Sequence, residues 1–174
     1  MLIGFCGIPD CGKSTAARHL HETRGFAWVN ISHPIKAMLR GLYEWCGLES
    51  AEIERRIDGD LKNIPDPLLN GKTPRYAMQT LGYEWRNLIH TELFADRWGD
   101  RVMTFDNVAS DSMRYPNEMP ALRRAGGILV EIQRPGLVET TGHPAENQKL
   151  DPDHVIVNDG SIEDLQAKVD ELIS

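Results

Sequence analysis

Short apolar runs alternate with amphipathic segments along most of the chain. Leu2–Cys6 is almost wholly apolar, which indicates a buried strand, and Ser14–Glu22 after it has helical composition. Further strands are expected at Phe26–Ile31, Asn107–Asp111, Ile128–Ile132 and Val155–Val157. Strands that alternate with helices favour a mainly parallel sheet covered on both faces. The pattern therefore predicts a three-layer α/β/α domain with a five-stranded sheet, and it leaves the strand order open.

The stretch between the second and third expected strands is mostly helical. Helices are predicted over Ile35–Tyr43, Glu49–Leu61, Thr73–Asn87 and Leu88–Trp98, with a loop rich in Pro, Asn and Gly at Asn63–Thr73. In the third helix, Tyr76, Leu81 and Trp85 are expected to share an apolar stripe, and Gly82 weakens the prediction of an unbroken helix. We therefore expect one domain, 1–174, with a helical insert at about 33–100.

The end of the chain combines a polar segment with a final helix. Gly, Pro and polar residues around His143 predict a long loop at about 137–153, which could close over a ligand as a lid. Ser161 is the expected N-cap of the last helix, with Asp164 three residues on. Leu165, Val169 and Leu172 give that helix an apolar face.

The motif that carries chemistry follows the first strand directly. Gly7-Ile8-Pro9-Asp10-Cys11-Gly12-Lys13-Ser14 matches G-x-x-x-x-G-K-[ST] between a strand and a helix, which favours a phosphate-binding loop over a chance glycine turn. Inward-facing backbone N–H groups and the helix N-terminus attract an anion. Lys13 supplies a charge for the β- and γ-phosphates, and the Ser14 hydroxyl suits Mg²⁺. The motif predicts a nucleoside triphosphate ligand and does not identify the phosphate acceptor.

Composition excludes several other classes of function. The chain has 174 residues, 41% of them hydrophobic, and a net charge of −7 without any basic block. Duplex nucleic acid is therefore not expected as the main partner, because phosphate contacts need clustered cations. Three cysteines without zinc spacing predict free thiols in a reducing compartment, with Cys11 as a small filler in the loop. No signal peptide or membrane span is recognised, so a cytoplasmic protein is expected.

Polar residues at the predicted strand ends are candidates for the site, because ligands bind there in open α/β sheets. Asp111 could hold the Mg²⁺ shell or orient the acceptor, or be a simple turn residue. Arg114 could pair bidentately with an acceptor phosphate, and Arg134 is a second cation on the same edge or part of a surface ion pair. Ser32 and Lys36 are either substrate contacts or a helix cap and a solvated lysine.

Three further blocks of sequence form recognisable patterns. The most specific block is Ser110-Asp111-Ser112-Met113-Arg114-Tyr115-Pro116-Asn117-Glu118, followed by Gly126-Gly127 and Arg134-Pro135-Gly136. The second is Leu81-Gly82-Tyr83-Glu84-Trp85-Arg86, preceded by Gln79. The third comprises His143 with Glu146, and Val157-Asn158-Asp159-Gly160. Together these blocks resemble one known family, the deoxynucleoside monophosphate kinases of bacteriophages. The chain departs from the family where members often carry Asp directly after the loop lysine, since it has Ser14 there.

The resemblance implies that ATP, with Mg²⁺, donates its γ-phosphate to a 2′-deoxynucleoside 5′-monophosphate, giving the diphosphate and ADP. The expected catalytic residues are Lys13, Arg86, Arg114 and Asp111, with Ser14 as the metal ligand. The expected ATP-binding residues are Gly7, Asp10, Cys11, Gly12, Lys13, Ser14, Thr15 and Arg134. The expected acceptor-binding residues are Ser32, Lys36, Arg75, Gln79, Trp85, Arg86, Arg114, Asn117 and Glu118. The resemblance also suggests a homodimer, in the host cytoplasm if the protein is phage-encoded.

Two other functions fit the same loop. One is a kinase of another small acceptor, such as dephospho-coenzyme A or a sugar acid, because one fold serves many acceptors. The other is a nucleotide-binding module that contacts a partner without catalysis, against which the intact Lys13 and Ser14 argue.

Overall fold

The computed structural model describes residues 1–137 and 150–174, and its centre is a parallel sheet. The five strands are β1 (Leu2–Cys6), β2 (Ala27–Trp28), β3 (Val108–Ser110), β4 (Ile128–Gln133) and β5 (His154–Val157). They lie in the order β2-β3-β1-β4-β5, and every pairing is parallel. The predicted fold class is therefore confirmed, and the structure supplies the strand order that the sequence left open.

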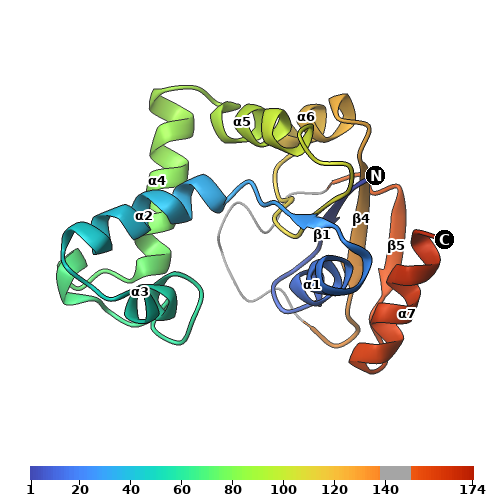
Figure 1. Cartoon of the computed structure of the whole chain (residues 1–174), viewed down its shortest axis with the longest axis horizontal. Coiled ribbons are helices and arrows are strands. Elements are labelled where there is room, and N and C mark those ends of the chain that lie inside the picture. Colours follow the sequence, from blue (N-terminus) through green and yellow to red (C-terminus); the bar gives the residue numbers. More distant parts are fainter. Residues whose placement is uncertain (138–149) are drawn as a thin grey trace. The chain divides into compact units, whose positions relative to one another are not determined.

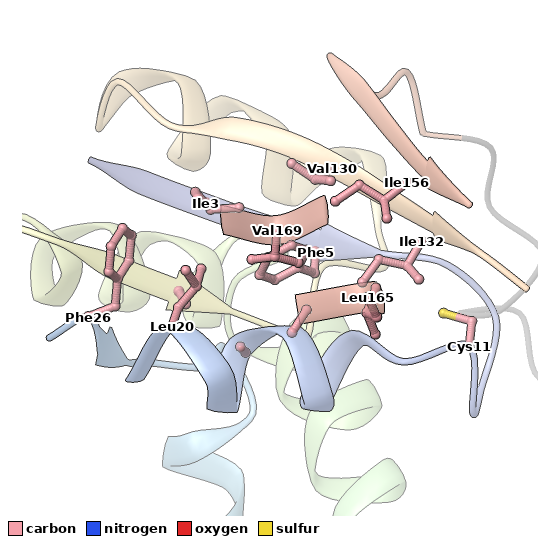
Figure 2. Close-up of a cluster of buried hydrophobic side chains, with 13 residues drawn as sticks. Ile3, Phe5, Cys11, Leu20, Phe26, Val130, Ile132, Ile156, Leu165 and Val169 are labelled. Carbon is pink, nitrogen blue, oxygen red and sulfur yellow. The ribbon is translucent and has the colours of Figure 1, made fainter. Parts of the chain in front are cut away.

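One face of the sheet packs on α1 (Lys13–Arg24) and α7 (Ile162–Leu172), which lie side by side (Figure 1). Successive side chains of a strand point to opposite faces, so Ile3 and Phe5 of β1 share this side. Figure 2 shows them with Val130, Ile132 and Ile156 of the neighbouring strands, and with Leu20 of α1 and Leu165 and Val169 of α7. This buried cluster fixes the positions of β1 and α1, and with them the two ends of the phosphate-binding loop.

The opposite face of the sheet is covered by α6 (Met119–Arg124), beside which lies α5 (Leu93–Val102) (Figure 1). The helix approaches β1 closely because the strand has a glycine here. A Cβ on Gly4 would lie 2.8 Å from the side chain of Met113 and 3.4 Å from that of Leu122. A larger residue at position 4 would therefore push α6 away from the sheet.

The helical stretch Ser32–Phe94 forms a second compact unit, apart from the sheet-containing unit of Met1–Ile31 and Ala95–Ser174. It consists of α2 (His33–Trp45), α3 (Ser50–Ile57), the short 3₁₀ turn η1 (Pro67–Leu69) and α4 (Pro74–Leu88), followed by the start of α5. Leu39, Tyr43, Ile53 and Ile57 are buried in its core. The predicted insert at about 33–100 falls on this unit, although most of α5 belongs to the other one.

Helix α4 differs from the sequence prediction in its buried face. It runs unbroken through Gly82, and its buried residues are Pro74, Met78 and Gly82, spaced four apart. The predicted stripe is wrong, because Tyr76 is 51% exposed and Trp85 39%. Gly82 belongs to the packed face, since a Cβ there would lie 3.0 Å from Ile35.

The second strand and the segment before β5 are the other places where the structure bears on the sequence predictions. The second strand is shorter than predicted, since only Ala27–Trp28 pairs with β3. The predicted lid at about 137–153, with His143 and Glu146, lies largely outside the described residues. Among the residues the structure describes, no helix combines the length and apolar character needed to cross a membrane.

The α1–α7 pair is joined at its far end by Asp170, and this contact yields a prediction on stability. Asp170 accepts hydrogen bonds from Arg24 at 2.7 and 2.9 Å and contacts His19 at 2.9 Å. Arg24 first, and then His19, lower the pKa of Asp170 to about 2, against a partial cost of burial. Because the folded-state pKa lies below the unfolded one, the contact stabilises the protein above about pH 4 and is lost as the pH falls toward 2.

We expect Asp170→Asn to lower the free energy of unfolding by about 1 kcal/mol at pH 7, since the contact is partly exposed. The difference from the wild type should shrink between pH 4 and pH 2, which urea melts at several pH values would measure. A difference that stays constant down to pH 2 would contradict this assignment. Asp159→Asn, at another ion pair of the same unit, is the comparison variant.

Candidate nucleotide-binding site

The loop between β1 and α1 adopts a backbone that glycine alone accommodates at two positions. Gly7 has φ 129° and Gly12 has φ 115°, both in the region that residues with a Cβ avoid. A Cβ on Gly7 would collide with the carbonyl oxygen of Ile132, and one on Gly12 would lie 2.8 Å from the side-chain nitrogen of Asn158. The two glycines of the motif are therefore required by the backbone itself.

The loop is also anchored from β5. The side-chain nitrogen of Asn158, which is 9% exposed, donates a 2.8 Å hydrogen bond to the carbonyl oxygen of Cys11. The backbone N–H of Asn158 donates to Gln133 at 2.7 Å, which fixes the residue against β4. The sequence places Asn158 in one of the family blocks and assigns it no role. Its position directly after the last strand, beside the loop in a parallel sheet, was the available signal.

Lys13 lies at the first position of α1 and folds back over its own loop. Its ammonium donates to the carbonyl oxygens of Gly7 at 2.8 Å and Ile8 at 2.6 Å. It also lies 3.7 Å from the Sγ of Cys11. The charge is thus held beside the loop backbone, where a bound phosphate would meet it.

The two cysteines near the loop are buried. Cys11 is fully buried within the core cluster, as the filler interpretation expects. Burial, and then the charge of Glu131, raise the pKa of Cys6 to about 12, so this thiol stays protonated at neutral pH. Both sulfur atoms belong to buried residues, so neither is accessible as a nucleophile.

Asp111, directly after β3, meets the start of α1. The Ser14 hydroxyl donates to one carboxylate oxygen of Asp111, and the indole N–H of Trp28 donates to the other at 3.3 Å. The backbone N–H of Asp111 donates at 2.9 Å to the side-chain oxygen of Asn30, which also accepts from Ser110. The neighbouring strand β2 and the residues after it thus orient the carboxylate toward Ser14.

A hydroxyl beside a carboxylate suits a hard divalent cation, because Mg²⁺ prefers oxygen ligands and takes few of them from the protein in phosphate sites. The described residues contain no cluster of three or more His, Cys, Asp or Glu side chains of the kind that binds a metal without other ligands. The donor set of Ser14 and Asp111 therefore fits Mg²⁺ carried with a nucleotide.

Glu118 organises the block that follows Asp111. Its side chain is 2% exposed, and it accepts from the backbone N–H groups of Arg114 at 2.7 Å and Tyr115 at 3.0 Å. This closes the turn before α6 and holds the backbone of Arg114, whose own side chain is exposed. Glu118 thus acts on the turn, while Asn117 beside it is half-buried.

A pocket of about 380 Å³ opens beside the phosphate-binding loop. Its lining contains most of the predicted ATP-binding residues: Asp10, Gly12, Lys13, Ser14, Thr15 and Arg134. The sequence did not predict the others, which come from the end of β5 and the first turns of α7: Asn158, Gly160, Ser161, Ile162 and Leu165. Arg134 follows β4 directly, is exposed, and lines the same pocket as this second group.

The other predicted acceptor residues lie in the helical unit. Ser32 is at the N-cap position of α2, but its side chain makes no capping hydrogen bond there. Lys36 pairs with Asp58 at 2.7 Å, and Arg75 donates to Asn63 at 2.6 Å. Trp85 stacks on Phe94, over which the Arg86 guanidinium also lies, and Gln79 is half-buried.

The sheet order and the loop together define a P-loop kinase fold. The APS kinase CysC of Mycobacterium tuberculosis, solved in complex with AMPPNP and APS, shares this fold with a TM-score of 0.51. The two chains are 14% identical, and the likeness covers 99% of this chain and 97% of that one. At this identity the comparison shows the fold alone.

Two viral proteins are similar in sequence. A protein of Acanthamoeba polyphaga mimivirus, named "Putative deoxynucleotide monophosphate kinase", is 29% identical over 97% of this chain and 94% of its own length. The deoxynucleotide monophosphate kinase of Enterobacteria phage T4 is 28% identical over 84% of this chain and 62% of its own length. No family model matches the chain. These similarities confirm the resemblance to deoxynucleoside monophosphate kinases.

The hydrogen bond from Asn158 to the loop predicts an effect of mutation on both stability and binding. Asn158→Leu keeps the volume and leaves the buried carbonyl of Cys11 without its donor, which costs about 2 kcal/mol. We expect a lower melting temperature and at least a tenfold weaker affinity for ATP, measured by calorimetric titration. Asn87→Leu, at an exposed position of α4, is the matched control. Unchanged ATP affinity in Asn158→Leu would show that the loop keeps its shape without this bond.

Proposed function

We propose that this chain is a deoxynucleoside monophosphate kinase. It transfers the γ-phosphoryl group of ATP to the 5′-phosphate of a 2′-deoxynucleoside monophosphate, and the products are ADP and the diphosphate. The single observation that carries the proposal is the glycine loop, which brings Lys13 and Ser14 together with Asp111 beside a pocket of nucleotide size. The two viral relatives, named for this activity, support the choice of acceptor.

In this proposal the sheet-containing unit binds ATP, the phosphate donor. The loop amides and Lys13 bind the β- and γ-phosphates, and their positive charge stabilises the charge that builds up on the transferred group. The remaining pocket, between Arg134 and the first turn of α7 at Ile162, takes the nucleoside of ATP. Arg134 can lie over the flat base, since a guanidinium stacks well on a π face.

Mg²⁺, when bound, would supply positive charge that neutralises the phosphates of ATP. Ser14 and Asp111 are the residues that would hold it. Trp28 and Asn30 keep the Asp111 carboxylate turned toward Ser14, so the protein ligands are oriented before a nucleotide arrives. This arrangement lowers the cost of ordering them on binding.

The acceptor is held by cations and polar groups outside the loop. In the proposed mechanism Arg75, Arg86 and Arg114 bind the acceptor phosphate or the transferred group, while Ser32, Lys36, Gln79, Trp85 and Asn117 contact the acceptor. Glu118 contributes indirectly, because it fixes the backbone of Arg114. An acceptor oxygen forms the new P–O bond as the bond between the γ-phosphorus and the ADP oxygen breaks. Held in line, the two groups react without a covalent enzyme intermediate.

The assembly and setting of the enzyme belong to the same proposal. By the viral resemblance, we infer a homodimer that acts on free nucleotides in the host cytoplasm, with no membrane or duplex nucleic acid as partner. Size-exclusion chromatography with light scattering would measure the oligomeric state directly.

The direct test is a panel of the four 2′-deoxynucleoside monophosphates, with ATP and Mg²⁺, in which ADP formation is measured. Dephospho-coenzyme A and sugar acids are included as competing acceptors. We expect ADP from at least one deoxynucleotide and none from the other acceptors. Turnover restricted to a competing acceptor would replace the proposed function, and no turnover with any acceptor would favour a binding module.

Lys13→Ala tests the donor side of the mechanism. Removal of one preorganised cation at the developing charge should lower kcat by at least about a hundredfold. The fold should survive, because the Lys13 side chain is only half-buried and contacts its own loop. Melting curves check the fold, and Lys72→Ala, at an exposed lysine of the helical unit, is the control. Wild-type turnover in Lys13→Ala would refute the assignment of the loop.

A further inference from the structure

The helical unit contains a group of cations that is not balanced by carboxylates. Two lysines, Lys36 of α2 and Lys62 after α3, contact the same oxygen of Asp58, at 2.7 and 3.4 Å. Their ammonium nitrogens are thus no farther apart than the sum of these distances. Arg40 reaches the other oxygen of Asp58 at 3.7 Å and is paired more closely with Glu54, at 2.6 Å. We call Lys36, Asp58 and Lys62 the Asp58 cluster.

A third cation adjoins the cluster. The backbone N–H of Arg75 donates to the carbonyl oxygen of Lys62 at 3.0 Å, and the Arg75 guanidinium donates to the neutral side chain of Asn63. Burial lowers the pKa of Lys62, and the nearby charges of Lys36 and Arg75 add to this effect against the attraction of Asp58. Lys62 is therefore repelled by both Lys36 and Arg75, and one carboxylate, that of Asp58, contacts both lysines.

Other cations of the same unit are arranged differently. Arg55 contacts the carboxylates of both Glu52 and Asp60. Arg56 likewise contacts Glu52 and the buried Asp66. In these pairs each cation has two anionic partners, whereas Lys36 and Lys62 share one. The excess positive charge is thus a local property of the Asp58 cluster and Arg75.

The lysines are accessible although partly desolvated. Their side chains are 18% and 24% exposed, that of Asp58 is 43% exposed, and Arg75 is exposed. An ammonium has three N–H donors, of which the contact with Asp58 uses one on each lysine. A tetrahedral dianion could therefore bridge the two ammonium groups, and in this partly desolvated place each contact counts more than at an open surface.

We propose that Lys36 and Lys62 form an anion subsite for the 5′-phosphate of the deoxynucleoside monophosphate, with Arg75 beside it and the Asp58 carboxylate as the anion that contacts both lysines in its place. This inference rests on the proposed function for the identity of the ligand. It adds Lys62 and Asp58, which no sequence motif indicated, to the acceptor site. Asp58 also competes with the phosphate, because both are anions that bind the same ammonium groups.

Because Asp58 and the phosphate compete, the proposal predicts opposite changes in binding affinity for the lysine variants and for the Asp58 variant. Loss of a lysine, in Lys62→Gln or Lys36→Gln, should weaken binding of a deoxynucleoside monophosphate at least tenfold. Loss of the competing carboxylate, in Asp58→Asn, should strengthen it several-fold. If the cluster had only a structural role, all three substitutions would weaken binding of the monophosphate. Arg55→Gln, which removes a balanced cation of the same unit, should bind as the wild type does.

The measurement is calorimetric titration of the whole protein with each deoxynucleoside monophosphate, with the matching deoxynucleoside and with inorganic phosphate, at fixed ionic strength. Binding of the unphosphorylated deoxynucleoside should be equal in all variants, since the subsite acts on the phosphate. The subsite is overturned if Lys62→Gln and Lys36→Gln bind the monophosphate and inorganic phosphate as tightly as Arg55→Gln does. It is also overturned if Asp58→Asn binds these two ligands more weakly than the wild type.

The same experiment separates the subsite from the proposed function. If the wild type neither binds nor phosphorylates a deoxynucleotide, the proposed function fails. The binding of inorganic phosphate, compared between the wild type and the lysine variants, then decides whether the subsite exists. If the wild type turns over and the lysine variants keep its KM for the acceptor, the subsite fails while the function stands. Melting curves of each variant exclude unfolding, and Lys62→Arg, which keeps the charge, should retain most of the binding if Lys62→Gln does not fold.

Discussion

The site depends on one short stretch of backbone that cannot relax into an ordinary turn. Gly7 and Gly12 hold positive φ angles, and the loop between them is closed against β4 and β5 by close contacts and by the hydrogen bond from Asn158 to Cys11. Since α1 begins at Lys13, the same stretch also sets where the helix N-terminus and Ser14 lie. The core between the sheet and helices α1 and α7 keeps both ends of the loop in place.

Sequence reasoning predicted the parts of the structure that depend on local pattern. The apolar runs gave the five strands and the parallel sheet, and the motif gave the loop, because strand, glycine turn and helix follow one another in the chain. The pattern could not give what depends on contacts distant in sequence. Asn158 is 147 residues from Cys11, and no local rule pairs them. In α4, the predicted stripe failed because Gly82 is the residue that packs.

The charges show how an acidic chain can still contain local positive sites. The chain carries a net charge of −7. Lys13 nevertheless lies beside the loop backbone, and Lys36 and Lys62 share one carboxylate between them. Asp111 faces Ser14 as a metal ligand would, and Asp58 gathers two lysines around itself. A negative net charge is compatible with a pocket that needs only a few local cations.

The conformation of the loop is tested most directly by calorimetric titration of ATP into Gly12→Ala and Gly25→Ala. Both glycines have positive φ, but a Cβ on Gly12 meets Asn158 and Leu165, whereas one on Gly25, at the end of α1, meets open space. Both substitutions therefore place alanine at a positive φ angle, but only Gly12→Ala changes the phosphate-binding loop. We predict that Gly12→Ala loses at least a hundredfold in ATP affinity while Gly25→Ala binds as the wild type does. Equal affinities in the two variants would contradict the claim that the shape of this loop creates the nucleotide site.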